Sequence, residues 1–184
     1  PELEHIAPKT ENPETGYGYI HAISEESGQD APKSVRAFVE KPDVETATQY
    51  LAQGDYYWNS GMFIMRASVW IKLLTEFRSD IANLVERAWQ SRSQDNRFVR
   101  PDRTEFFNIP AASIDYAVME KCSTSLAHFG IPTKMLPLDA GWSDLGAWEA
   151  VWQTSAKDKQ NNVVRGDVLM EDCSDNLIYA QTTL

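Results

Sequence analysis

The chain has 184 residues, of which 42% are hydrophobic and 11% are aromatic. A disordered chain is poorer in apolar residues, so this composition predicts one folded domain, or one domain plus part of another. The net charge of −10 and the pI of about 4.7 argue against nonspecific binding to nucleic acid or anionic membrane, because both need a basic surface. An anionic substrate is not excluded, since a few local cations, backbone N–H groups or a metal ion can bind phosphate.

Two further features concern the compartment and the extent of the chain. Cys122 and Cys173 are too few for a disulfide framework and indicate reduced thiols in a cytoplasmic protein. No apolar run is long enough for a membrane span, and no signal peptide is recognisable. The sequence begins at Pro1 and ends at Leu184, inside a pattern typical of a strand, so we expect it to be part of a longer protein.

The first third of the chain predicts a loop, three strands and one helix. Residues 1–16 are polar and rich in proline, which is typical of a loop. Asp43 is a typical helix N-cap and Gly54 a typical helix end, so we expect a helix between them. β-Prone residues predict strands over 18–23, 35–39 and 62–65, the last of them fully buried.

The rest of the chain predicts further helices and then more strands. Ser68 and Ser113 are typical N-caps, and apolar residues repeat at helical spacing behind each of them. Another helix is expected around residues 81–88, and the later elements are a strand over 134–138, a helix over 147–154 and strands over 163–170 and 176–180. This mixture predicts an α/β layer fold, with one domain over 1–156 and a linker and β-rich segment over 157–184.

The sequence Phe-Val-Glu-Lys-Pro places a carboxylate and an ammonium together at a predicted strand end. Lys41 could meet a phosphate as a compact point charge, and Glu40 could accept hydrogen bonds from hydroxyl groups. Adjacent strand residues point to opposite faces, so both reach one ligand only where the strand ends. Pro42 restricts Lys41 to extended geometry and predicts such an end. A solvated charged pair before a helix is an equally good interpretation of this motif alone.

Two glycine-containing segments carry groups that suit a sugar. The Asn59 amide offers a donor and an acceptor for a hydroxyl, and Gly61 lets the backbone approach a ligand closely. Around Gly18 and Tyr19, glycines alternate with tyrosines, so backbone could lie against a sugar ring between aromatic side chains. A turn before a strand explains either segment, and for Asn59 and Gly61 the turn is the simpler interpretation.

Asp144 lies between two glycines, in the sequence Gly-Trp-Ser-Asp-Leu-Gly, after a predicted strand. A carboxylate in this position could bind Mg²⁺, which takes one or two carboxylates together with substrate phosphates. An N-cap of the following helix is the simpler interpretation, and both could hold. The histidines lack the spacing of metal ligands and are interpreted as surface or packing residues.

Five motifs together resemble the bacterial mannose-1-phosphate guanylyltransferases: PETGYGYI, FVEKP, YYWNSGMF, SIDYAVMEK and GWSDLGAW. The resemblance extends from about Pro8 to Cys173. Many members of that family are fused to mannose-6-phosphate isomerase. The resemblance implies a Rossmann-like nucleotidyltransferase fold, in which helices flank a mixed central sheet. It also implies transfer of GMP from GTP to mannose 1-phosphate with Mg²⁺, giving pyrophosphate and GDP-mannose for polysaccharide biosynthesis. The sugar-phosphate oxygen would attack the α-phosphorus in line, with catalysis by positioning and charge neutralisation.

The resemblance assigns roles to single residues. Glu40 and Asn59 would contact mannose hydroxyls, and Lys41 would contact the sugar phosphate. Lys41 and Asp144 would be the catalytic residues of this part, with Asp144 as one of two metal-binding aspartates. The residues expected at the sugar phosphate are Gly18, Tyr19, Glu40, Lys41, Asn59 and Gly61.

The sequence departs from the family in one large respect. Family members begin with a glycine-rich loop, G-x-G-x-R-L-x-P-L, that holds the triphosphate, and neither this loop nor the second metal-binding aspartate is present. We therefore expect the 184 residues alone to be inactive, with exposed sheet edges that invite association with another copy into an oligomer. The tail from Val163 resembles the start of a β-helix-like segment. Asp115 and Glu120 receive no chemical role, since a helix N-terminus explains Asp115.

Two alternative functions stay open at this point. The protein could use another sugar 1-phosphate or another nucleotide, because the absent segments would set the choice of base. It could also be a noncatalytic sugar-phosphate sensor or scaffold, which an upstream sequence without the glycine-rich loop would favour.

Overall fold

The computed structural model describes residues 2–23, 28, 31–122 and 131–181, so Pro1 and Leu184 lie outside it. It divides into two compact units, Pro1–Ala140 and Gly141–Leu184, which are described separately. Within the described residues, no helix has the length and apolar character needed to cross a membrane. Both cysteines are free thiols, as predicted. The domain boundary predicted at residue 156 stays a prediction.

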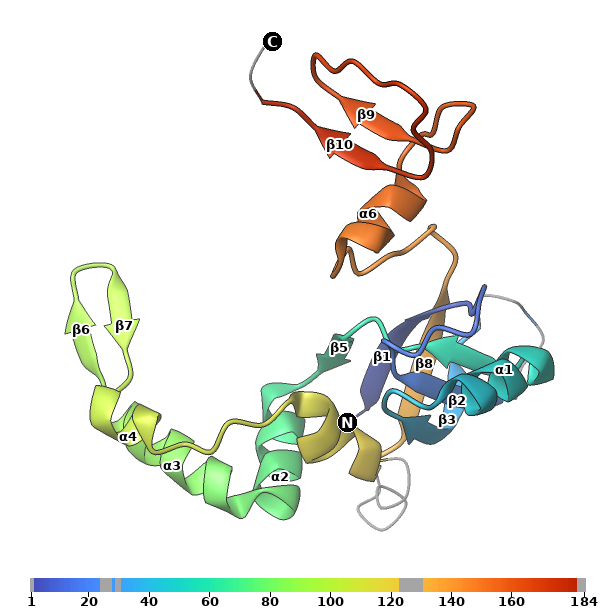
Figure 1. Cartoon of the computed structure of the whole chain (residues 1–184). Coiled ribbons are helices and arrows are strands. Elements are labelled where there is room, and N and C mark those ends of the chain that lie inside the picture. Colours follow the sequence, from blue (N-terminus) through green and yellow to red (C-terminus); the bar gives the residue numbers. More distant parts are fainter. Residues whose placement is uncertain (1, 24–27, 29–30, 123–130, 182–184) are drawn as a thin grey trace. The chain divides into compact units, whose positions relative to one another are not determined.

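The first unit is built on a six-stranded mixed sheet (Figure 1). Its strands are β1 (Leu3–Pro8), β2 (Tyr19–Ile23), β3 (Lys33–Val39), β4 (Tyr56–Trp58), β5 (Met62–Met65) and β8 (Thr133–Leu138). They are ordered β4-β2-β3-β8-β1-β5 across the sheet. β1 and β8 run parallel, whereas the other neighbours are antiparallel. The predicted mixed central sheet is therefore confirmed.

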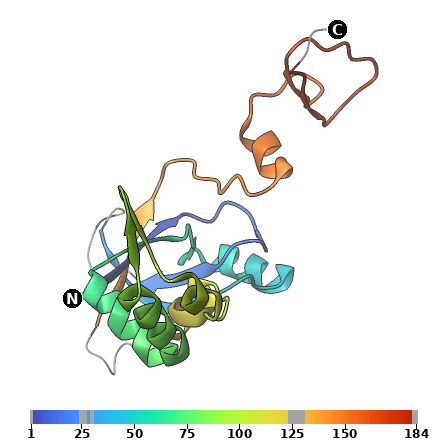
Figure 2. The same ribbon diagram turned by 90° about the vertical axis from the view of Figure 1, so that its left-hand side faces the viewer.

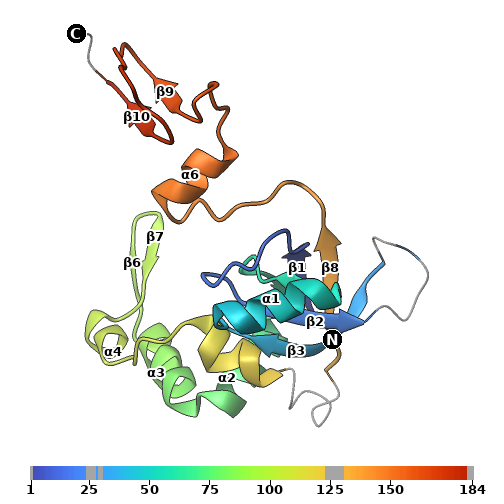
Figure 3. The same ribbon diagram turned by 45° about the vertical axis from the view of Figure 1, so that its right-hand side comes forward.

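This unit contains the helices α1 (Val44–Gln53), α2 (Ala67–Phe77), α3 (Ser79–Gln90), α4 (Arg103–Phe107) and the π-helical turn η1 (Asp115–Met119). α1 packs on one face of the sheet, and α2 and η1 pack on the other. A hairpin of β6 (Ser93–Asp95) and β7 (Phe98–Arg100) lies between α3 and α4 in the chain. Figures 2 and 3 show α1, in cyan, on one side of the sheet and α2 and η1, in green and yellow, on the other.

The alternation of side chains along β2 agrees with this arrangement. Tyr19 packs against Tyr50 of α1, with ring centroids 5.5 Å apart. Its neighbour Ile20 belongs instead to the main core, together with Val69 of α2 and Val118 of η1. Successive residues of a strand point to opposite faces, so the face of Ile20 is the one that α2 and η1 cover.

The prediction of a loop over residues 1–16 is wrong where β1 runs. This strand lies between β8 and β5, with Leu3, His5 and Ala7 buried. Only two of these inner residues are aliphatic, and charged side chains and prolines flank them, so the period-two pattern is weak. The prediction of a fully buried strand over 62–65 is also wrong, because β5 is an edge strand and Ile64 is 52% exposed.

Two of the three helix N-caps predicted in the first unit are confirmed. Asp43 Oδ1 accepts a hydrogen bond from the Thr46 N–H at 2.8 Å, and Gly54 ends α1 with a left-handed φ of 78°. Ser113 Oγ accepts a hydrogen bond from the Tyr116 N–H at 3.3 Å, although the turns that follow are π-helical. Ser68 is not a cap, since α2 begins at Ala67 without a side-chain cap.

The contrast between these serine and aspartate positions is testable by stability. Asp43→Ala removes a cap and is expected to lower the free energy of unfolding by about 1 kcal/mol. Ser68→Ala removes an exposed hydroxyl without a capping role and should change this free energy by less than about 0.5 kcal/mol. Equilibrium urea unfolding measures both, and equal losses for the two variants would contradict the assignment of the caps.

The second unit contains α6 (Trp148–Thr154) and the strands β9 (Val163–Arg165) and β10 (Leu177–Tyr179). The helix predicted over 147–154 is confirmed to within one residue. β9 and β10 pair in parallel, and the first of them is shorter than the predicted strand over 163–170. Buried Asn162 joins the two strand entries, because its Oδ1 accepts a hydrogen bond from the Asn176 N–H at 3.0 Å. Parallel pairing of successive strands is compatible with the predicted β-helix-like segment.

Candidate functional site

Three neighbouring strand ends bring predicted site residues together. Gly18 directly precedes β2, Glu40 follows β3 and Asn59 follows β4. Because β2 is antiparallel to both β3 and β4, its start lies beside their ends. Glu40 shares a face with Phe38, and Asn59 with Tyr57, since alternate residues point the same way. Phe38 and Tyr57 belong to the main core, so the site lies on the face that α2 and η1 cover.

The Glu40 carboxylate is a nearly buried charged group of this site. Its side chain is 8% exposed, and its Oε2 atom is buried without a hydrogen-bond partner. A Cβ atom at Gly18 would lie 2.4 Å from Oε2, so a larger residue there would force this carboxylate or the backbone to shift. Burial raises the pKa of Glu40, the Asp115 charge raises it further, Lys41 opposes the shift and Glu120 adds to it. The site therefore holds a carboxylate that is shielded from solvent and whose Oε2 atom accepts no hydrogen bond from the protein.

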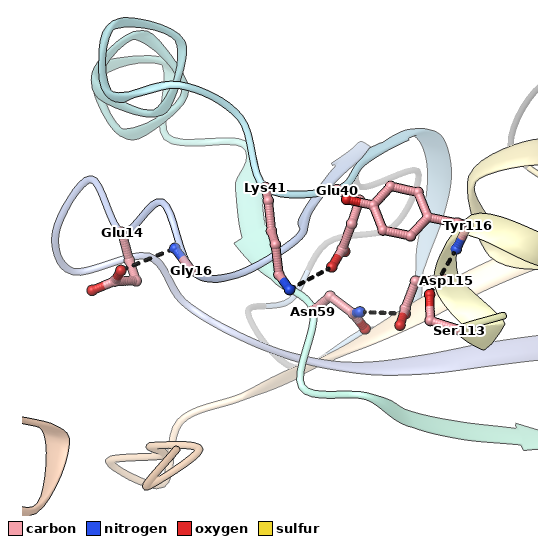
Figure 4. Close-up of polar contacts among 8 residues, drawn as sticks. All are labelled: Glu14, Gly16, Glu40, Lys41, Asn59, Ser113, Asp115 and Tyr116. Atoms are coloured by element: carbon pink, nitrogen blue, oxygen red, sulfur yellow. Dashed lines mark hydrogen bonds and ion pairs between the residues drawn. The ribbon is translucent and has the colours of Figure 1, made fainter. Parts of the chain in front are cut away.

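Lys41 reaches the same place through a backbone conformation that the sequence did not predict. The extended geometry expected before Pro42 is wrong, because Lys41 has a left-handed φ of 47°. This turn brings Lys41 Nζ to 3.8 Å from Glu40 Oε1, as Figure 4 shows, although adjacent strand residues would point apart. A left-handed residue other than glycine costs about 1 to 2 kcal/mol, and such strain clusters at functional sites.

The Asn59 side chain is held at both ends of its amide. Its Nδ2 donates a hydrogen bond to Asp115 Oδ1 at 2.8 Å (Figure 4), and its Oδ1 accepts one from the Gly61 N–H at 3.1 Å. The Asn59 backbone N–H donates to the Gly18 carbonyl at 2.8 Å. Gly61 has a φ of 72°, which requires glycine, so in this structure its visible role is to fix Asn59. Both interpretations of the motif, turn and site, are thus compatible with the geometry.

Asp115 joins this site, although the sequence patterns assigned it no chemistry. It lies half-buried at the start of η1 and contacts Asn59 on the face of the sheet that α2 and η1 cover. The available signals were the place of Asp115 and Glu120 in the SIDYAVMEK motif and their spacing of five positions. No sequence pattern marks a π-helical turn, so the proximity of these residues to Glu40 could not be read from the chain.

Tyr19 supports the loop before β2. Its side chain is fully buried on the α1 face, and its hydroxyl donates a hydrogen bond to the Glu14 carbonyl at 2.8 Å. The same loop is closed by the Gly16 N–H, which donates to Glu14 Oε1 at 3.0 Å (Figure 4). In this structure the part of Tyr19 nearest Gly18 is its backbone, and its contact with a substrate stays a prediction.

Asp144 belongs to the second unit. Its Oδ1 accepts a hydrogen bond from the Gly146 N–H at 2.9 Å, whereas α6 begins after Ala147 without a side-chain cap. The interpretation of Asp144 as a helix cap is therefore wrong. The residue is exposed, and a single carboxylate of this kind fits Mg²⁺, which also takes water and phosphate oxygens. Within the part of the chain that the structure describes, no three acidic, histidine or cysteine residues form a metal cluster.

Known proteins have sequences similar to most of this chain. It is 44% identical over 167 residues to the xanthan biosynthesis protein XanB of Xanthomonas campestris pv. campestris (strain B100). This alignment covers 91% of the chain and 33% of XanB. It is 40% identical over 174 residues to the mannose-1-phosphate guanylyltransferase of Escherichia coli (strain K12), covering 94% of the chain and 35% of that protein. The chain thus spans about a third of the length of these curated relatives.

Solved structures and a family profile agree with these relatives. A crystal structure from Thermus thermophilus, described as a mannose-1-phosphate geranyltransferase, matches with a TM-score of 0.78 and 26% identity, over 98% of this chain and 49% of the other. A mannose-6-phosphate isomerase structure from Helicobacter pylori matches with a TM-score of 0.63 and 28% identity, over 78% and 52% of the two chains. Residues 3–161 match the profile described as nucleotidyl transferase. The chain therefore belongs to the nucleotidyl transferase family.

Proposed function

We propose that the protein transfers GMP from GTP to mannose 1-phosphate, and that this chain supplies the sugar-phosphate site. One observation carries the proposal, which is the state of the Glu40 carboxylate. Its Oε2 atom is buried without a hydrogen-bond partner, and its Oε1 atom lies 3.8 Å from Lys41 Nζ. An unsatisfied buried acceptor costs about 1 to 3 kcal/mol, which a sugar hydroxyl would relieve by donating a hydrogen bond. The relatives named as mannose-1-phosphate guanylyltransferases support mannose as the sugar.

Each residue of the site has a separate task in this proposal. Glu40 accepts hydrogen bonds from a hydroxyl, Asn59 contacts a second position on the ring, and the backbone at Gly18 lies against the sugar. Lys41 neutralises the phosphate, whose oxygen attacks the α-phosphorus of GTP. Positioning and charge neutralisation supply the catalysis, so no covalent intermediate on the protein is needed.

Mg²⁺ is part of the same proposal. Asp144 would hold it through one carboxylate oxygen, which suits a hard cation that also takes phosphate oxygens. The cation would neutralise phosphate charge during transfer. Association with another copy and a cytoplasmic location are further expectations, which size measurement and cell fractionation would test.

The first test concerns Lys41 in the full-length protein. Lys41→Met is expected to weaken binding of mannose 1-phosphate by about tenfold to a hundredfold, because a charge-assisted contact to phosphate is worth about 1.5 to 3 kcal/mol. Binding of unphosphorylated mannose should change by less than about twofold. Isothermal titration calorimetry measures both sugars. Lys9→Met is the matched control, since Lys9 forms an exposed ion pair with Asp139 at 3.7 Å.

Turnover separates this function from its alternatives. Release of pyrophosphate from GTP with mannose 1-phosphate, and not with glucose 1-phosphate, supports the proposal. Preference for glucose 1-phosphate or for another nucleotide would identify a different sugar nucleotidyltransferase. Tight binding of mannose 1-phosphate without pyrophosphate release would identify a noncatalytic sensor.

A further inference from the structure

The orientation of the Asn59 amide is decided by groups on both sides of it. The Gly61 N–H can only donate, so it selects the carbonyl oxygen of the amide, at 3.1 Å. An ionised carboxylate can only accept, so Asp115 selects the NH₂ group, at 2.8 Å. Together they exclude the flipped amide, in which the NH₂ group would face the Gly61 N–H and the carbonyl oxygen would face the Asp115 carboxylate. The second N–H of Nδ2 and one oxygen lone pair are the capacity left for other partners.

The π-helical turn is what presents Asp115 to Asn59. The Glu120 N–H donates to the Asp115 carbonyl, a bond between residues five apart that defines this turn. Residues five apart lie roughly on one face of a π-helix, whereas in an α-helix they point about 140° apart. Asp115 and Glu120 therefore approach Glu40 together, while Ala117, Val118 and Met119 are buried in the core. π-Turns inside helices frequently mark functional sites.

We propose that Asp115 is a positioning residue of the sugar-phosphate site, which fixes the Asn59 amide so that it offers an N–H donor to a hexose hydroxyl. This inference rests on the proposed function, because it concerns the same sugar. It adds a complementarity that the sequence motifs left open, since Asn59 could have served as donor or acceptor. With Asp115 in place, Glu40 accepts and Asn59 donates, and hydroxyl groups at two positions of the ring can satisfy them because each hydroxyl is both a donor and an acceptor.

Removal of the Asp115 carboxylate tests the role in the full-length protein. Asp115→Leu has a similar shape and leaves the Asn59 amide held only by the Gly61 N–H, so binding of mannose 1-phosphate should weaken by about tenfold, the value of one charge-assisted hydrogen bond. Asp115→Asn keeps an acceptor without the charge and should lose only about threefold, since neutral hydrogen bonds are weaker. Calorimetric titration gives both dissociation constants.

A double-mutant cycle separates positioning from mere support of the fold. In an Asn59→Leu background there is no amide to orient, so Asp115→Leu should change the dissociation constant by less than about twofold. A loss of about tenfold in both backgrounds would overturn the proposal, because Asp115 would then act independently of Asn59. If the leucine variant fails to fold, the same comparison with Asp115→Asn decides, with a loss of about threefold expected only when Asn59 is present.

Two controls keep this result distinct from the proposed function. Asp80→Leu removes a carboxylate that is hydrogen-bonded to Arg78 at 2.8 Å on another helix, and it should leave the dissociation constant unchanged. If the unmodified protein does not bind mannose 1-phosphate, the proposed function fails and the positioning role fails with it. If it binds and Asp115→Leu binds equally well, only the positioning role is overturned.

Discussion

Gly18→Ala is expected to weaken binding of mannose 1-phosphate by about a hundredfold. The added Cβ would lie 2.4 Å from Glu40 Oε2 and 3.3 Å from Asn59 Cβ. Either the buried Glu40 carboxylate moves or the Gly18 backbone moves, and the second shift pulls on the hydrogen bond from the Asn59 N–H. Both routes displace a group that we propose contacts the sugar, and two charge-assisted or amide contacts are worth about 3 kcal/mol together.

Gly16→Ala is the matched control for this variant. Its Cβ would approach only Glu14 Oε1, at 3.3 Å, which is the end of a side chain in a loop, so binding should change by less than about twofold. A second comparison uses Glu40→Ala, which removes the atom that the new methyl group meets. Gly18→Ala added to that background should cost much less than it costs alone. Calorimetric titration of the unmodified protein, the two single variants and the double variant measures this difference. Unaltered binding by Gly18→Ala would contradict the assignment of Glu40 to the sugar.

The sequence was informative where chemistry and local structure coincide. Gly18 and Glu40 stand next to strands that β-prone residues predicted, whereas β4, the strand that Asn59 follows, was not predicted. Antiparallel pairing of these neighbouring strands brings their ends together. Asp43 and Gly54 bound α1 because capping depends on a few adjacent residues. These features are local, so a short stretch of neighbouring residues contains most of what determines them.

Features that depend on distant partners were missed. β1 owes its place to pairing with β5 and β8, which are far away in the chain, while its own residues are too polar to signal a strand. Lys41 adopts a left-handed turn although Pro42 favours extended geometry, so tertiary context overrides a local preference. Asp115 reaches Asn59 only through a π-helical turn, and the two residues are 56 positions apart in the chain.

His5 is expected to make the protein lose stability as the pH falls below about 6.5. It is 1% exposed in β1, its ring lies 5.1 Å from that of Phe63 and 6.1 Å from that of Phe38, and its Nδ1 has no partner. Burial lowers the pKa of His5 from 6.5 to about 4. The unfolded chain therefore takes up a proton at a higher pH than the folded chain, so stability is complete above about pH 6.5 and falls as the pH drops towards about 4.

The size of this loss follows from the shift in pKa. The full shift corresponds to about 3 kcal/mol, of which about 2 kcal/mol should appear between about pH 7 and about pH 5. Equilibrium urea unfolding at both pH values measures the loss, and His5→Leu, which cannot be protonated, should reduce it by that amount. His21→Gln is the matched control, because it removes a half-buried histidine that pairs with Asp55 and leaves His5 in place. A pH dependence that survives in His5→Leu and disappears in His21→Gln would contradict the assignment, since the acid-sensitive group would then lie at the surface of the sheet and not in its core.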